Sequence, residues 1–147
     1  MHLEGKVTID SAQADVWNFL TTPDKVSKCV PGLKSMSIIE PDKKFKAEAG
    51  LGLGTVKVTF NAEVEWLELD KPNRAKMKAR GVAPGSSIDA VSEIKMTSEG
   101  EKKTLLEWTA EVTVVGKIAT LASRLMGGVS QKMAGEFFNC VKSQVEK

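Results

Sequence analysis

The sequence has little of the chemistry that catalytic and metal sites use. Its 147 residues include one histidine and two cysteines. The histidine, His2, lies at the N-terminus, where disorder is common. The cysteines, Cys29 and Cys140, lie far apart in the sequence and lack metal-ligand spacing. No metal site and no cofactor are therefore expected.

Long apolar runs are also missing. No run approaches the roughly 20 residues that are needed to cross a bilayer. The chain passes from Met1 directly into an alternating pattern, without the apolar core of a secretory leader. We therefore expect a cytoplasmic protein with reduced cysteines, whose membrane contact, if any occurs, is peripheral and at the inner face of the membrane.

The charge is balanced. Lysine and arginine total 21 and aspartate and glutamate total 19, which gives a net charge of +2. The densest basic stretch, residues 71–80, alternates with apolar residues as a solvated strand face does. Bulk electrostatics therefore predict no nucleic-acid partner.

Hydrophobic periodicity predicts the elements. Alternation over residues 3–9 indicates a strand, and helical spacing follows over residues 14–20, with a second short helix over residues 25–29. Alternating stretches separated by turn residues then predict strands at Leu33–Ile39, Lys44–Gly50, Thr55–Glu68, Arg74–Val82, Ser86–Ser98 and Lys103–Val115. After Gly116 the period becomes helical as far as Val141.

This order predicts an α+β fold within one domain, residues 1–147. The connections are short, so neighbouring strands should pair antiparallel. Seven strands with normal twist cannot lie flat, and we expect the sheet to curl around the long C-terminal helix.

The strand period sorts the side chains onto two faces. The inner face is apolar, and nearly every carboxylate of the sheet points to solvent. General acid–base and nucleophilic catalysis both need a positioned titratable group in a pocket. The sequence shows no such constellation and argues against an enzyme.

The inner face is also rich in alanine and methionine. Small facing residues either bring layers close or leave a cavity, and methionine suits a variable apolar guest. The alternative is that these residues fill an irregular core. We predict a ligand cavity that is lined by Phe60, Ala62, Met77, Ala79, Ala90, Ser92, Ile94, Trp108, Ala110, Leu121, Leu125, Met126, Val129, Met133 and Phe137.

Four local features have two interpretations each. Gly50–Gly54 is expected to be a hairpin turn rather than a phosphate-binding loop, because a strand follows it. Gly127-Gly128 indicates close packing or a helix break, or else a bend that admits a ligand. Glu136 is either a surface carboxylate or a contact for a polar ligand group at the cavity mouth. Cys29 is expected to be unpaired and buried.

Several of these strings together resemble a known family. The Cys29-Val30-Pro31-Gly32 turn, the Gly50–Gly54 hairpin, and Gly116-Lys117-Ile118-Ala119 opening a helix that reaches Phe137-Phe138 are similar to the CoxG-like family of carbon monoxide dehydrogenase subunits. That family belongs to the START-type helix-grip (SRPBCC) superfamily, and the resemblance runs from Leu3 to Val141.

The resemblance implies a helix-grip fold, a hydrophobic cavity under the long helix and no catalytic residues. It also implies an accessory role beside a molybdenum hydroxylase of the carbon monoxide dehydrogenase type, in membrane recruitment or in handling a quinone-like lipid. Some members carry a C-terminal extension for membrane attachment, and this sequence stops at Lys147. We therefore expect transient peripheral membrane contact at most.

Three functions remain open. The first is non-enzymatic binding of a hydrophobic small molecule, a quinone or lipid. The alternative is an interaction or assembly subunit for the hydroxylase, whose cavity is incidental. The second alternative is a cyclase- or hydrolase-type enzyme of the same superfamily, which would use Ser92 or Glu136 with water.

Overall fold

The computed structural model describes residues 1–41 and 43–146. Strand β1 (His2–Ile9) leads into helix α1 (Gln13–Thr21), the short helix α2 (Pro23–Val26) and the 3-10 turn η1 (Ser27–Cys29). Six strands and one long helix follow: β2 (Leu33–Glu40), β3 (Lys44–Leu53), β4 (Val56–Asp70), β5 (Arg74–Ala83), β6 (Ser86–Gly100), β7 (Lys103–Gly116) and α3 (Ala119–Val145).

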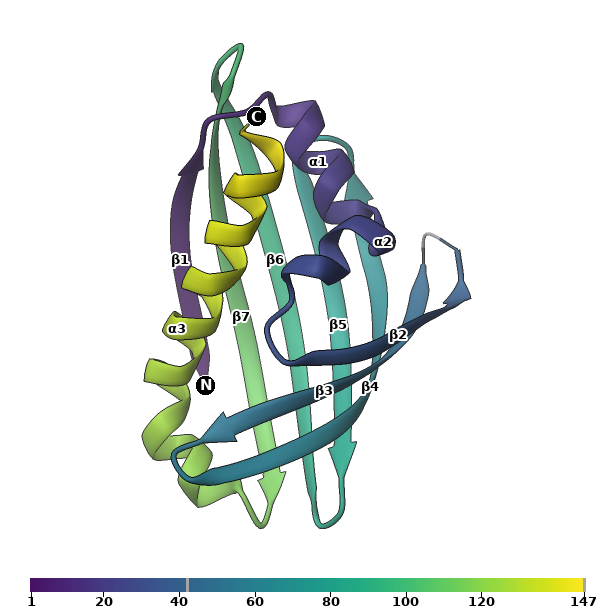
Figure 1. The fold of residues 1–147 in the computed structure, drawn as a ribbon, viewed down its shortest axis with the longest axis vertical. Helices are drawn as coiled ribbons and strands as arrows, with labels where there is room; N and C mark the ends of the chain where they lie inside the picture. The colour runs from purple at the N-terminus through teal and green to yellow at the C-terminus, as the bar shows by residue number, and fades with distance from the viewer. Residues whose placement is uncertain (42, 147) are drawn as a thin grey trace.

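All seven strands form one antiparallel sheet in the order β1-β7-β6-β5-β4-β3-β2. Consecutive strands pair through short turns, and β1 pairs with β7 at the opposite edge from β2. Strands β2 and β3 run across the direction of β5 to β7, because the twisted sheet curls. Helix α3 extends along the sheet from the β3–β4 turn to α1 (Figure 1). The predicted α+β helix-grip fold is confirmed.

The inside of the molecule contains two apolar clusters. The larger one joins β1, α1 and the end of α3, and includes the fully buried Ile9, Val16, Leu106 and Val141. The smaller one lies at the start of α3 and consists of Phe60, Ile118, Ala122 and Met126 with partly buried neighbours. Helix α3 therefore packs in separate places at its two ends.

The prediction of two reduced, unpaired cysteines is wrong. Cys29 and Cys140 form a disulfide, with their Cα atoms 5.4 Å apart. The curl of the sheet brings η1 against the last third of α3, so residues 111 positions apart become neighbours. Cys29 is buried as expected, with 4% of its surface exposed.

The glycine-rich segments have clear outcomes. Residues 50–54 do belong to a hairpin, as expected, but the turn is shorter: β3 continues to Leu53, and Gly54, with a φ of 64°, lies in the β3–β4 turn. Helix α3 runs unbroken through Gly127 and Gly128. No described atom lies within 4 Å of a Cβ built at either position, so close packing does not explain these two glycines.

The membrane expectation concerns the helices. Within the described part of the chain, no helix is both long enough and apolar enough to cross a membrane.

Candidate functional site

A cavity of about 520 Å³ lies between the sheet, the α1–α2–η1 segment and the C-terminal half of α3. This volume is within the range of pockets that hold drug-sized ligands. Val30, which lies between η1 and β2, lines the cavity and is 37% exposed.

The strand register builds the floor of the cavity. Trp66 lies opposite Met77, Met77 opposite Ser92, and Ser92 opposite Ala110. Residues directly opposite each other point to the same side of a sheet, so these side chains form one row across four strands. All four line the cavity.

The indole of Trp108 packs over a glycine of β1, which has no side chain in its way. It lies opposite Gly5 of the edge strand β1, and a Cβ built at Gly5 would lie 2.8 Å from the indole Nε1. The ring therefore covers the backbone of β1 while it lines the cavity. Any larger residue at position 5 would push the ring away from the sheet.

The polar groups of the cavity wall are neutral. Among the described lining residues, hydroxyls come from Thr21, Ser27, Ser92 and Ser130, and no side chain is charged. Thr21 donates to the Trp17 carbonyl at 2.8 Å and Ser27 donates to the Asp24 carbonyl at 3.4 Å. An ion in this cavity would have no charged partner, so the wall suits a neutral guest.

The structure divides the predicted lining residues into two groups. Met77, Ser92, Ile94, Trp108, Ala110, Met133 and Phe137 line the cavity. Phe60, Leu121, Leu125, Met126 and Val129 belong to the smaller cluster at the start of α3. Ala62, Ala79 and Ala90 are half-buried and lie along their strands between the two regions. A ligand contact by any of these residues stays a prediction.

The cavity wall also contains residues that the sequence did not assign to it. The α1–α2–η1 segment and the turn into β2 supply Leu20, Thr21, Pro23, Val26, Ser27, Val30 and Pro31, and strands β2, β3 and β4 supply Leu33, Met36, Phe45, Ala47, Val64 and Trp66. The remaining lining residues are Ala75, Leu106, Ser130, Ala134 and Phe138. The sequence indicates that β3, β4 and α3 each have an apolar face. It does not indicate at which end of the sheet the cavity lies.

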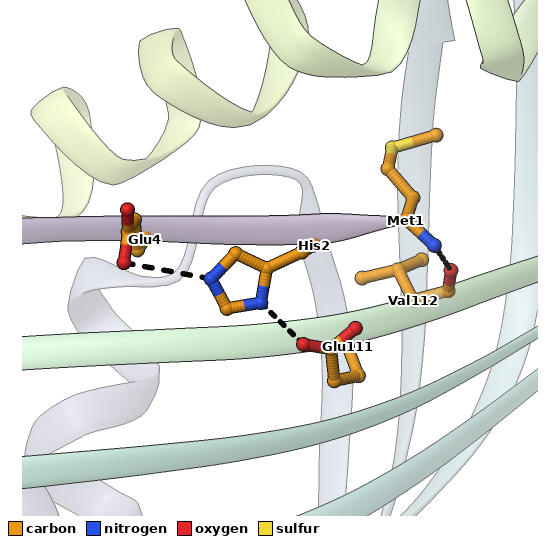
Figure 2. A network of polar contacts seen from close by, with 5 residues as sticks. All are labelled: Met1, His2, Glu4, Glu111 and Val112. Carbon is orange, nitrogen blue, oxygen red and sulfur yellow. Dashed lines mark hydrogen bonds and ion pairs between the residues drawn. The ribbon is translucent and has the colours of Figure 1, made fainter.

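The titratable candidates lie elsewhere. Glu136 is exposed and does not line the cavity. His2 is ordered in β1, on the outer face of the sheet, beside Glu111 and Glu4 (Figure 2). Hydrogen bonds to Glu111 and then to Glu4 raise the pKa of His2. No group of three or more potential metal ligands occurs in residues 1–41 and 43–146.

Solved structures share this fold. A conserved protein from Geobacillus kaustophilus superposes with a TM-score of 0.91 at 27% identity, over 99% of this chain and 95% of that one. The Zhui aromatase/cyclase from Streptomyces sp. R1128 gives 0.77 at 15% identity, over 99% and 93%. A START superfamily protein from Mycobacterium smegmatis gives 0.72 at 9% identity, over 99% and 97%. The last two likenesses concern the fold alone.

The sequence comparisons give the family. No curated protein matches the chain. A family profile for CoxG, a subunit of carbon monoxide dehydrogenase, matches residues 5–146. This match includes every described residue that lines the cavity, from Leu20 to Phe138, and the chain therefore belongs to the CoxG family of carbon monoxide dehydrogenase subunits.

Proposed function

We propose that this protein binds a neutral hydrophobic molecule, a quinone or another lipid, and that it does so without catalysing a reaction. The observation behind the proposal is the cavity of about 520 Å³, whose described lining side chains are apolar apart from four hydroxyls and the indole N–H groups of Trp66 and Trp108. An apolar ligand would gain about 25 cal/mol for each Å² that it removes from water. Ser92 and Ser130 offer hydroxyls to a carbonyl or hydroxyl on the guest.

The family suggests where such a ligand would be used. Membership of the CoxG family supports an accessory role beside a molybdenum hydroxylase of the carbon monoxide dehydrogenase type. We propose that the protein works in the cytoplasm and collects its ligand during transient contact with the inner face of the membrane. The point of transfer would lie near Val30, the exposed residue that also lines the cavity.

Native mass spectrometry with lipid extraction tests the binding proposal. The matched variants are Ala110→Phe, which places a ring in the cavity, and Thr109→Phe, which places the same ring on the exposed outer face of the same strand. Wild type and Thr109→Phe should retain menaquinone-type lipid, and Ala110→Phe should lose it. Equal retention by both variants, with both folded, would place the ligand outside this cavity.

The alternative function is an assembly subunit whose cavity is incidental. Its support is the family's description as a subunit of carbon monoxide dehydrogenase. In this case Ala110→Phe would capture the hydroxylase subunits in a pull-down as well as wild type does, and would also support hydroxylase activity. Loss of activity with capture unchanged would favour the ligand-binding proposal.

An enzyme of the cyclase or hydrolase type needs a titratable group that touches the substrate. Ser92 lines the cavity, but the described lining residues include no side chain that could act as its base. Glu136, the other candidate, is on the exposed side of α3. The geometry therefore supports binding better than catalysis.

A further inference from the structure

The Cys29–Cys140 disulfide joins two walls of the cavity. Cys29 is the last residue of η1, and its neighbours Val26 and Val30 line the cavity. Cys140 lies on α3 shortly after Phe137 and Phe138, which line the cavity from the other side. The bond therefore fixes the distance between these two parts of the cavity wall.

Apart from the disulfide, the wall segment, residues 23–31, is attached to the larger apolar cluster through Cys29 and the partly buried Val26. Helix α2 contains no buried residue, and Cys29 is the only buried residue of the wall segment. The backbone hydrogen bonds described for Lys25, Val26 and Val30 connect them to residues 22 and 27, within the same short stretch. Segments with few buried apolar contacts and only local hydrogen bonds open most easily.

A thiol can approach the bond from the protein surface. Cys29 is buried, whereas Cys140 is partly exposed. A polar groove of about 440 Å³ is lined by residues next to both cysteines, namely Lys28, which precedes Cys29, and Gln144, one helical turn after Cys140; Lys25 and Asp15 also line it. The two lysines supply positive charge on this side of the molecule, offset in part by Asp15, and positive charge near a sulfur favours its thiolate form.

We propose that Cys29–Cys140 is a thiol–disulfide exchange site whose reduction releases the wall segment and opens the ligand cavity. The proposal rests on the ligand-binding function proposed above. The reductant is a dithiol, such as a cytoplasmic dithiol protein. In the cytoplasm disulfides are rare, and those that occur are usually transient or redox-sensing rather than structural.

The exchange is a two-electron reduction in two steps. A thiolate of the reductant attacks the sulfur of Cys140, the Cys29–Cys140 bond breaks, and Cys29 leaves as a thiolate that takes up a proton. The second thiolate of the reductant then attacks its own partner sulfur in the mixed disulfide and releases Cys140, which is also protonated. The reductant becomes a disulfide, and the protein gains two thiols.

The test measures how fast a neutral fluorescent probe, N-phenyl-1-naphthylamine, leaves the protein in stopped-flow displacement. Dithiothreitol should accelerate release from wild type about tenfold, which corresponds to an activation free energy lower by about 1.4 kcal/mol. A Cys29→Ala/Cys140→Ala double variant should release the probe at the fast rate with or without dithiothreitol. At short exchange times, which report local opening, hydrogen exchange should increase in residues 23–31 on reduction while β6 and β7 stay protected; the lower global stability accelerates only the slower exchange of those strands.

Each other outcome is informative. Equal release rates, with two free thiols counted after reduction, would overturn the proposal and leave ligand binding intact. Loss of the far-UV circular dichroism signal on reduction would also overturn it, because the bond would then be a structural crosslink. Failure of the folded protein to bind the probe or menaquinone-type lipids in either redox state would instead remove the proposed function.

Discussion

Removal of the disulfide should lower the global stability by an amount that follows from its position. The bond joins residues 111 positions apart. In the chain-entropy model, a closed loop of that length restricts the unfolded chain by about 5 kcal/mol at 25 °C. A domain of this size has a total unfolding free energy of about 5–15 kcal/mol, so a loss of about 5 kcal/mol is large. The reduced protein stays folded in water if the unfolding free energy of the oxidised protein lies in the upper part of that range.

Urea denaturation of the Cys29→Ala/Cys140→Ala variant measures this loss. With an m value of about 2 kcal/mol/M, a loss of about 5 kcal/mol lowers the midpoint by about 2.5 M. Wild type with dithiothreitol should show the same lowered midpoint, and dithiothreitol should not affect the variant. Coincident midpoints for oxidised wild type and the double variant would refute the reasoning, since they would show that the bond does not constrain the unfolded chain.

Three further changes test other parts of the structure. Gly128→Ala should raise the unfolding free energy by about 0.5–1 kcal/mol, because the added methyl group meets no described atom and alanine favours the helical conformation. A lower unfolding free energy in urea denaturation would show that the helix needs this glycine. Gly5→Ala should lower the unfolding free energy by about 1–3 kcal/mol and shift the tryptophan fluorescence emission, because the added methyl group displaces Trp108. An unchanged unfolding free energy would contradict the packing of Trp108 over Gly5. In an NMR titration His2 should show a pKa above its ordinary value of about 6.5, and Glu111→Gln should lower this pKa. Because the pKa is raised in the folded state, the stability that the protonated His2 contributes is complete below the unfolded-state pKa and is lost as the pH rises through the folded-state pKa. A pKa at or below the ordinary value would contradict the contacts.

The fold could be predicted from the sequence because its information is local. Alternation along each strand fixed which side chains face inward, and turns such as Pro84-Gly85 fixed the antiparallel order. Met77, Ser92 and Ala110, which were expected on the inner face, lie opposite one another on three neighbouring strands.

The position of the cavity could not be predicted in the same way. Alanines on both halves of the inner face look alike in the sequence, and only the tertiary arrangement shows that Phe60 and Met126 fill one end. The other end contains the cavity, and α2 and η1 cover this cavity with partly buried side chains such as Val26. The disulfide depends on the same tertiary information, since the curl of the sheet brings Cys29 to Cys140.

The central claim is that the cavity under α3 holds a neutral hydrophobic molecule. The most direct measurement is native mass spectrometry of the purified oxidised protein in the presence of menaquinone-type lipids and, separately, of fatty acids of similar size. The account predicts a one-to-one complex with the neutral lipid, weak or no binding of the anionic acid, and loss of the complex in Ala110→Phe but not in Thr109→Phe. A folded protein that binds neither lipid, or that prefers the anionic acid, would contradict it.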